Sequence, residues 1–266
     1  SNSTREVAQD GRRGALMLTI SIKHPDAERF IDAKVDTSKV TGANVSIKID
    51  DEFMRAAIAG KPYHQQFPID AEKPMYEQDI DARALWKKII HNAWKSAEPG
   101  VLFWDTILRE SVPDCYADEG FNTVSTNPCG EIPLCPYDSC RLLALNLYSY
   151  VDKPFTAEAS FDFAKFRDHV GKAMRMMDDI IDLELEKVEQ IIAKIDADPE
   201  EADIRYVESN LWKKVREMAL KGRRTGLGIT AEGDMIAALG MRYGSDEAVA
   251  FAVEVHKTLA LAAYGA

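Results

Sequence analysis

The sequence has no long hydrophobic run and no basic stripe. Among its 266 residues, no apolar stretch approaches the roughly 20 residues of a bilayer-crossing helix, and the polar start at residues 1–10 has no apolar signal core. Acidic residues outnumber basic ones by 44 to 33, which gives a formal net charge of −11, and no cluster of Lys and Arg with interleaved aromatics offsets that charge locally. We therefore expect a soluble, cytoplasmic protein that binds neither a membrane nor nucleic acid.

Cysteine is absent from most of the chain. The four cysteines fall in one stretch, which is not how a disulfide scaffold is distributed: Cys115, Cys129, Cys135 and Cys140. Three explanations compete, namely a structural zinc site, a set of redox or catalytic thiols, and chance. Zinc sites usually contain close Cys-x-x-Cys pairs, whereas these spacings are longer and the nearest histidines, His91 and His169, lie well outside the cluster. The pattern therefore argues against zinc, and we expect no metal site.

The two ends predict a segment taken from a longer protein. The chain has no initiator Met, and residues 1–3 are typical of a cleaved tag. Residues 245–263 are apolar at helical spacing with Ser245 as N-cap, and the sequence stops when that helix is complete. A hydrophobic content of 46% is enough for a sizeable core, and we expect residues 4–266 to form part of one domain.

Hydrophobic patterning predicts an α/β fold. Residues 14–22 and 43–49 are typical of buried strands, with a short helical pattern at 27–33 between them, so a parallel crossover unit is expected. The remaining predicted helices end at turn or breaker residues and cover residues 51–59, 81–97, 161–195, 210–221 and 245–263. The polar, proline-bearing residues 61–80 are expected to be irregular.

The strongest chemical signal is the sequence Asn127-Pro128-Cys129-Gly130-Glu131. In an extended segment alternate side chains share a face, so Asn127, Cys129 and Glu131 would project together with neighbours about 6 to 7 Å apart. An amide, a thiol and a carboxylate on one face supply a hydrogen-bonding group, a sulfur centre and a general base. The alternative is an Asn-Pro turn with an incidental cysteine, and the spacing alone leaves both interpretations open.

Residues around this motif carry a family resemblance. The stretches 127–134 (NPCGEIPL) and 138–147 (DSCRLLALNL) resemble the active-site region of the large, catalytic subunit of ribonucleotide reductases. Further landmarks follow in that family's order: Arg12-Arg13-Gly14-Ala15, His24-Pro25-Asp26, Thr41-Gly42-Ala43-Asn44, Pro99-Gly100 with Asp105, and Arg224-Thr225-Gly226-Leu227-Gly228. The resemblance implies part of the ten-stranded α/β barrel of ribonucleotide reductases and glycyl radical enzymes, in which a finger loop carries the catalytic cysteine.

The resemblance also implies roles for single residues. Cys129 resembles the cysteine that becomes a thiyl radical and abstracts the 3′ hydrogen of the ribose. Glu131 resembles the general base that takes the 3′ hydroxyl proton, and Asn127 the residue that hydrogen-bonds the ribose. Cys140 resembles one of the two thiols that supply electrons when the 2′ hydroxyl leaves as water, and its partner is expected upstream of residue 1.

Nucleotide recognition is implied at two further places. The family's specificity loop corresponds to Lys39, Thr41, Gly42, Ala43 and Asn44. Arg12 and Arg13 lie near the position of the deoxynucleotide effector. Because the loop that binds the substrate phosphates is expected beyond residue 266, the isolated chain is expected to be inactive.

The source of the radical separates two classes of this family. Residues 132–140 and 146–151 resemble the adenosylcobalamin-dependent class II most, in which cleavage of a cobalt–carbon bond makes the radical. The alternative is class I, whose large subunit receives the radical from a separate iron protein. The resemblance further implies a ribonucleoside diphosphate or triphosphate substrate, a dNTP effector, a thioredoxin-type reductant and a homodimer.

Two interpretations from other classes remain. A cysteine hydrolase using Cys129 and Glu131 would need an activating base such as histidine, and both His91 and His169 are distant in sequence. A zinc-stabilised interaction module would contain stoichiometric zinc after purification.

Overall fold

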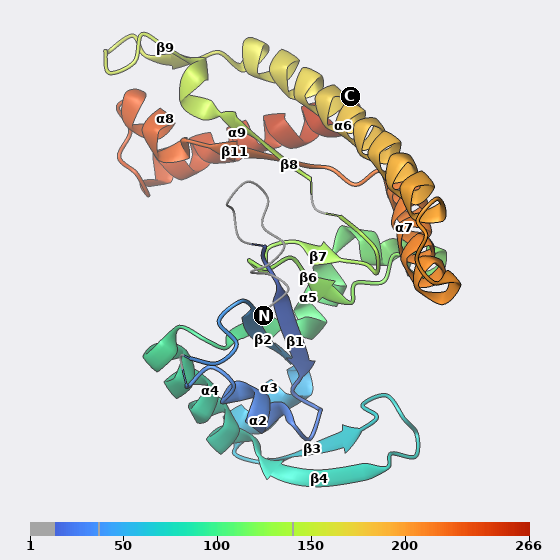
Figure 1. Ribbon diagram of the computed structural model, residues 1–266. Coiled ribbons are helices and arrows are strands. Elements are labelled where there is room, and N and C mark those ends of the chain that lie inside the picture. Colours follow the sequence, from blue (N-terminus) through green and yellow to red (C-terminus); the bar gives the residue numbers. More distant parts are fainter. Residues whose placement is uncertain (1–13, 37, 140) are drawn as a thin grey trace. The chain divides into compact units, whose positions relative to one another are not determined.

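The computed structural model describes residues 14–36, 38–139 and 141–266, which belong to two compact units (Figure 1). The first unit extends to Pro136 and the second runs from Tyr137 to Ala266. The expected tag remnant and the effector-proximal Arg12 and Arg13 lie outside the described residues, as does Cys140. Within the described part, no helix is long and apolar enough to cross a membrane.

A three-stranded parallel sheet lies at the centre of the first unit. Strand β2 (Asn44–Ile49) occupies the middle, between β1 (Met17–Ser21) and β5 (Gly100–Phe103). Helix α2 (Ala27–Ile31) connects β1 to β2. The predicted crossover unit and the α/β class are therefore confirmed.

Two capped helices complete the core of this unit. Asp50 precedes α3 (Asp51–Ala59) and Asp81 precedes α4 (Ala82–Ser96), and each carboxylate accepts a backbone N–H of the first turn. Helix α3 ends at Gly60, whose φ of 65° suits glycine. The buried core joins the sheet to these helices through Ile22, Ala27, Ile31, Ile47, Ile49, Phe53, Ala57, Tyr63, Ala82, Leu85 and Ile89.

The segment between α3 and α4 is a regular hairpin. Strand β3 (Pro62–Phe67) pairs with β4 (Tyr76–Asp81) in antiparallel register, so the prediction of an irregular segment was wrong. Only Tyr63 and Gln65 of β3 are buried, and the side-chain amide of Gln65 donates to the carbonyl of Ile22 at 2.7 Å. A polar hairpin of this kind lacks the apolar alternation by which a strand is recognised in sequence.

The first unit ends in short elements that lead to the cysteine motif. Helix α5 (Trp104–Glu110) follows β5 directly, and the 3-10 helix η1 (Val112–Glu119) follows α5. The chain then forms a second, much shorter hairpin from β6 (Ser125–Thr126) and β7 (Pro133–Leu134). We call residues 124–134 the cysteine hairpin.

The second unit combines one parallel strand pair with long helices. Strand β8 (Leu142–Asn146) pairs with β11 (Gly226–Thr230). Between them in sequence lie α6 (Phe163–Asp196) and α7 (Ala202–Gly222), which pack against each other. Helix α6 agrees with its predicted range of 161–195 to within two residues at each end, whereas α7 is longer than the predicted range of 210–221.

The strand pair approaches closely at Gly226. A Cβ added at this position would lie 2.7 Å from a methyl carbon of Leu142 and 2.9 Å from the carbonyl oxygen of Arg141. Since the second contact is with backbone, a larger residue would displace the strands. The glycine-rich stretch at 223–233 therefore serves strand pairing here.

The remaining elements of this unit surround its core. They are η2 (Leu147–Tyr150), β9 (Val151–Asp152), β10 (Ser160–Phe161), α8 (Glu232–Ala238) and α9 (Asp246–Gly265). The hydroxyl of Ser245 accepts the N–H of Ala248 at 3.3 Å, which confirms the predicted N-cap of α9. The core residues are Leu147, Tyr150, Phe161, Phe166, Val170, Met235, Ile236, Ala248 and Val255.

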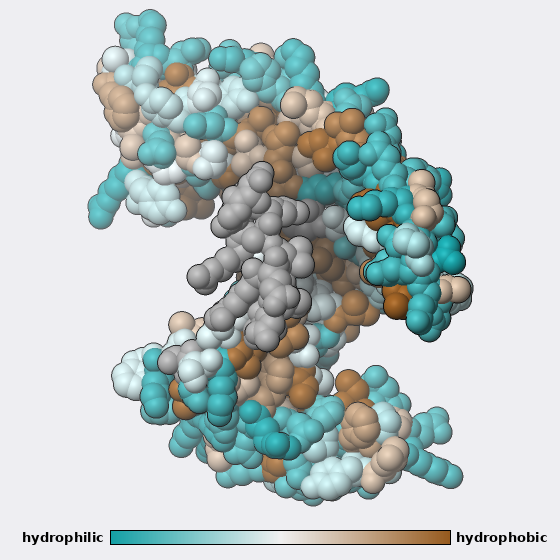
Figure 2. Space-filling model, in the orientation of Figure 1, coloured by the Kyte–Doolittle hydropathy of each residue, from teal (hydrophilic) through white to brown (hydrophobic). Residues whose placement is uncertain are grey.

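Helix α6 has a mixed surface. Figure 2 shows hydrophilic side chains over much of the visible face of the long helices, interrupted by hydrophobic ones. Of the methionines on α6, Met177 is fully buried whereas Met176 is 57% exposed. Met177 therefore fills the core, whereas Met176 lies at the surface.

Candidate active site

The motif at residues 127–131 forms the tip of the cysteine hairpin. Residues 127–132 connect β6 to β7, and the N–H of Asn127 donates to the carbonyl of Ile132 at 3.1 Å. The N–H of Gly130 donates to the carbonyl of Asn127 at 3.0 Å, which closes a four-residue turn. Gly130 has a φ of 88°, a conformation that glycine adopts without strain.

This turn overturns the expected extended geometry. In an extended strand the side chains of Asn127 and Glu131 would lie about 13 Å apart, at about 3.3 Å per residue. Instead the side-chain Nδ2 of Asn127 donates to Oε1 of Glu131 at 2.6 Å. Pro128 and Gly130 favour the reversal, because proline fixes φ at the second position of a turn and glycine accepts a positive φ.

The amide of Asn127 has both of its ends in use. While Nδ2 contacts Glu131, Oδ1 accepts the backbone N–H of Ile132 at 3.0 Å. The residue is only 9% exposed, whereas Cys129 and Glu131 are exposed. A buried amide thus fixes the direction of an exposed carboxylate, with an exposed thiol in the same turn.

Strand β2 holds the cysteine hairpin at two points. The side-chain Nδ2 of Asn44 donates to the carbonyl of Pro128 at 2.8 Å, and the ammonium of Lys48 donates to the carbonyl of Val124. Asn44 and Lys48 lie four positions apart on one face of β2, opposite the buried apolar face. Their acceptors are also four positions apart but in reverse order, so this edge of the hairpin runs antiparallel to β2.

The predicted specificity loop leads into this contact. Lys39 forms an exposed ion pair with Asp36 at 3.3 Å, within its own loop, and Thr41 and Gly42 follow. The carbonyl of Ala43 accepts the ammonium of Lys34 at 2.8 Å. The structure therefore brings the last residue of the loop, Asn44, to the tip of the cysteine hairpin, and leaves Lys39 paired with Asp36.

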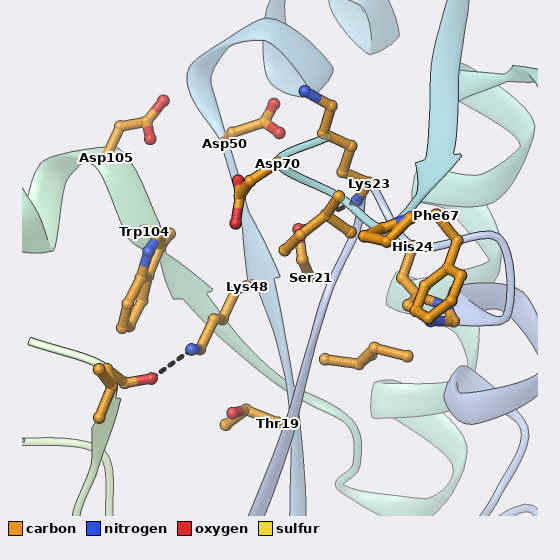
Figure 3. A pocket seen from close by; sticks show the side chains of 14 residues that line it. Thr19, Ser21, Lys23, His24, Lys48, Asp50, Phe67, Asp70, Trp104 and Asp105 are labelled. Carbon is orange, nitrogen blue, oxygen red and sulfur yellow. Dashed lines mark hydrogen bonds between the residues drawn. The ribbon is translucent and has the colours of Figure 1, made fainter. Parts of the chain in front are cut away.

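A cavity of about 700 Å³ lies at the base of the hairpin (Figure 3). Its lining includes Thr19, Lys48, Trp104 and Val124, and does not include Cys129. The ammonium of Lys48 lies 3.9 Å from the centroid of the Trp104 ring, a cation–π contact. Burial lowers the pKa of Lys48.

Sequence reasoning did not find Lys48 or Trp104 as neighbours of the motif. The available signal was the alternation along β2, which places Lys48 on the face of Asn44. Residue alternation gives the face but not the partner, since Val124 lies 76 positions away in sequence.

In the second unit, ion pairs anchor the segment on either side of position 140. Arg141 contacts both carboxylate oxygens of Glu184 on α6, at 2.5 and 2.7 Å, and its third nitrogen donates to the carbonyl of Arg224 at 3.0 Å. Arg224 in turn pairs with Asp138. The side chains of Arg141 and Asp138 are only 5% and 6% exposed, so both neighbours are firmly held.

The described cysteines differ in environment. Cys115 and Cys129 are exposed, while Cys135 is 4% exposed, next to β7. Over the described ranges, no group of three or more His, Cys, Asp or Glu side chains is placed to hold a metal ion.

Comparison with protein families assigns the chain. The family model for the ribonucleotide reductase barrel domain matches residues 1–266. The chain belongs to this family. The family predicted from the motif is therefore confirmed.

Individual relatives agree with this assignment. A vitamin B12-dependent ribonucleoside-diphosphate reductase of Thermoplasma acidophilum is 35% identical over 92% of the chain, and one of Mycobacterium tuberculosis is 30% identical over 96%. The chain spans only 28% and 32% of the length of these two ribonucleotide reductases.

A solved structure confirms the fold. The alpha subunit of a class Id ribonucleotide reductase of Actinobacillus ureae matches 95% of the chain with a TM-score of 0.63, at 18% identity. The match covers 40% of that subunit. The α/β fold expected from the sequence is thus that of a ribonucleotide reductase.

Proposed function

We propose that this chain is part of an enzyme that reduces ribonucleotides to 2′-deoxyribonucleotides by thiyl-radical chemistry. The observation that carries the proposal is the turn at the hairpin tip, where Asn127 holds the carboxylate of Glu131 at 2.6 Å beside the exposed Cys129. The names of the relatives, ribonucleoside-diphosphate reductases, support the same reaction class.

The hairpin tip supplies the groups for the first half of the reaction. The Cys129 sulfur, as a thiyl radical, takes the hydrogen atom from C3′ of the ribose, which forms an S–H bond and leaves a carbon radical. Glu131 accepts the proton of the 3′ hydroxyl. Asn127 orients that carboxylate, as the two hydrogen bonds of its buried side-chain amide support, and the second hydrogen on its Nδ2 is the donor left for the ribose.

The second half needs two electrons. The 2′ hydroxyl leaves as water, and a pair of thiols becomes a disulfide, which provides two electrons and two protons, one for the leaving water and one for C2′. The hydrogen atom held by Cys129 then returns to C3′, which regenerates the thiyl radical, and Glu131 returns its proton to the 3′ oxygen. We assign one of the two thiols to Cys140, which lies outside the described residues between the anchored Asp138 and Arg141.

We propose adenosylcobalamin as the cofactor, in line with relatives named vitamin B12-dependent. When bound, it supplies a carbon radical able to take the hydrogen atom of a thiol. The exposed position of Cys129 at the hairpin tip fits this chemistry, because the thiol can be approached directly. The names of these relatives favour class II over the class I alternative.

The other partners follow from the same assignment. Lys39, Thr41, Gly42, Ala43 and Asn44 form the specificity loop, Arg12 and Arg13 lie near the dNTP effector, and the substrate is a ribonucleoside diphosphate or triphosphate. A thioredoxin-type protein reduces the thiol pair, and the enzyme is a homodimer. The cytoplasm is a reducing compartment that suits such thiol chemistry, and we place the enzyme there.

Two cysteine variants of the full-length protein test the proposal. Cys129→Ser should abolish deoxyribonucleotide formation, because the O–H bond of serine is too strong to serve in hydrogen-atom transfer. Cys115→Ser, at an equally exposed thiol in η1, should retain at least about half of the wild-type rate, as expected for a surface change. Turnover above background in Cys129→Ser would contradict the assignment, and the isolated chain should form no product.

A further inference from the structure

The last residue of the specificity loop touches the residue that precedes the catalytic cysteine. Asn44 is the last residue of the loop and the first of β2, and its side-chain amide donates to the carbonyl of Pro128 at 2.8 Å. Cys129 follows Pro128 directly. One hydrogen bond therefore links the specificity loop directly to the backbone beside Cys129.

We infer that Asn44 is a positioning residue that sets the place of Cys129 relative to the specificity loop. The inference rests on the proposed function and adds a mechanical link to it. A loop that selects among nucleotide bases would thereby also adjust the distance between the Cys129 sulfur and the ribose of the selected substrate. Hydrogen-atom transfer is sensitive to such a distance, because productive geometry requires close approach of the reacting atoms.

The backbone on both sides of Asn44 is fixed by a single ion pair. The ammonium of Lys34 donates to the carbonyl of Ala43 at 2.8 Å, and the N–H of Val45 donates to Glu98 at 3.1 Å. Lys34 and Glu98 pair with each other, and each side chain is 19% exposed. The backbone of Asn44 is therefore held in place, so the hydrogen bond from its side-chain amide fixes the position of the hairpin tip.

Lys48 provides a contrast on the same face of β2. It also donates to a backbone carbonyl of the hairpin, that of Val124, but at the base and away from the specificity loop. Loss of Lys48 should loosen the hairpin without altering the response to effectors. Loss of Asn44 should release the tip and weaken that response.

Hydrogen exchange in the full-length protein tests the contact without reference to activity. In Asn44→Ala the amide of Gly130, which closes the turn at the tip, should exchange at least about threefold faster, as expected when a local closing contact is lost. Asn122→Ala, at an exposed asparagine before the hairpin, is the matched control and should leave this rate unchanged. An unchanged rate in Asn44→Ala would overturn the inference.

Substrate competition tests the consequence. With each dNTP effector in turn, the wild-type enzyme is given the four ribonucleotides, and the ratios of kcat/KM are compared with those of Asn44→Ala and Lys48→Met. We expect the effector-dependent preference to fall about tenfold in Asn44→Ala, the size of a typical allosteric coupling. We expect Lys48→Met to slow all substrates alike.

The outcomes separate the two proposals. An active wild type together with an unchanged preference in Asn44→Ala overturns the positioning role and leaves the proposed function intact. An equal loss of preference in Lys48→Met also overturns it, since the effect would then come from loosening the hairpin anywhere. A wild-type protein without reductase activity overturns both.

Discussion

The two segments assigned to chemistry are held in different ways. In the first unit, the hairpin tip with Cys129 is exposed, and side chains of β2 hold the hairpin by donating to neutral backbone carbonyls. In the second unit, the residues on either side of position 140 are held by ion pairs with largely buried members, Arg141 with Glu184 and Asp138 with Arg224.

The energetics of these contacts differ accordingly. The hydrogen bond between the exposed side chain of Asn44 and the carbonyl of Pro128 contributes about 0.5 to 1.5 kcal/mol, because water replaces it when it is lost. A buried charge left without its partner costs about 3 to 5 kcal/mol. The hairpin tip can therefore be adjusted at little cost, whereas Asp138 and Arg141 are fixed as part of the fold.

The largest expected effect lies in the second unit. Glu184→Gln removes the negative charge beside Arg141, whose guanidinium stays protonated and is only 5% exposed. We expect a loss of about 3 kcal/mol in the free energy of unfolding, measured by urea titration. Arg141→Met should cost less, because Glu184 is 27% exposed and can regain water.

Two further variants decide whether burial causes this loss. Asp179→Asn breaks the pair with Arg175 on the same helix, where the side chains are 56% and 80% exposed, and should cost under about 1 kcal/mol. The double variant Arg141→Met with Glu184→Met should recover most of the free energy of unfolding, since two apolar side chains leave no buried charge without a partner. A Glu184→Gln protein as stable as Asp179→Asn would show that the second unit does not depend on its buried ion pair.

A smaller effect is expected at the hairpin, on rate and not on folding. Glu131→Gln keeps an oxygen to accept the amide of Asn127 but removes the basicity of the side chain. Turnover of the full-length enzyme should fall about 100-fold, equivalent to about 2.7 kcal/mol in the activation barrier. Glu110→Gln, at an exposed position of α5, is the control, and a rate for Glu131→Gln within about threefold of it would exclude Glu131 as the base.

Elements with local signals were predictable from the sequence. Helix α3 was predicted at its observed bounds, because Asp50 caps its start and Gly60 ends it. The motif at 127–131 was selected as the candidate site because a family resemblance added information that spacing lacked. The structure joins Asn127 and Glu131 in one turn and not on the expected extended face, and their catalytic roles stay a prediction.

The rest depended on contacts that no local pattern records. The bend at the motif brings Asn127 to Glu131 through turn hydrogen bonds. The prediction from side-chain alternation assumed an extended segment without this bend. The ion pair of Arg224 with Asp138 joins residues 86 positions apart. Such pairs are set by tertiary packing, so a single sequence shows the charges but not their partners.

The smallest expected effect is at an exposed ion pair of the first unit. On the β3–β4 hairpin, Nδ1 of His64 lies 3.0 Å from Oδ1 of Asp79, and the imidazole is 45% exposed. The hydrogen bond to Asp79 raises the pKa of His64 above its ordinary 6.5, and Glu77 adds a smaller contribution of the same sign.

The His64–Asp79 pair should have a measurable effect on the pKa of His64 and almost none on the free energy of unfolding. Because the folded-state pKa is raised, the contribution of the pair is fully present below pH 6.5 and is lost as the pH rises through the raised pKa of His64. An NMR titration should place the pKa of His64 above 6.5, and Asp79→Asn should lower it, whereas Glu72→Gln on the connecting turn should not change it. Solvent screens this pair, so the stability of Asp79→Asn should match that of the wild type across the same pH range. An unchanged His64 pKa in Asp79→Asn would mean that the imidazole points into water and does not contact Asp79. The comparison of exposed with buried ion pairs would then depend on the Arg175–Asp179 pair of α6 alone.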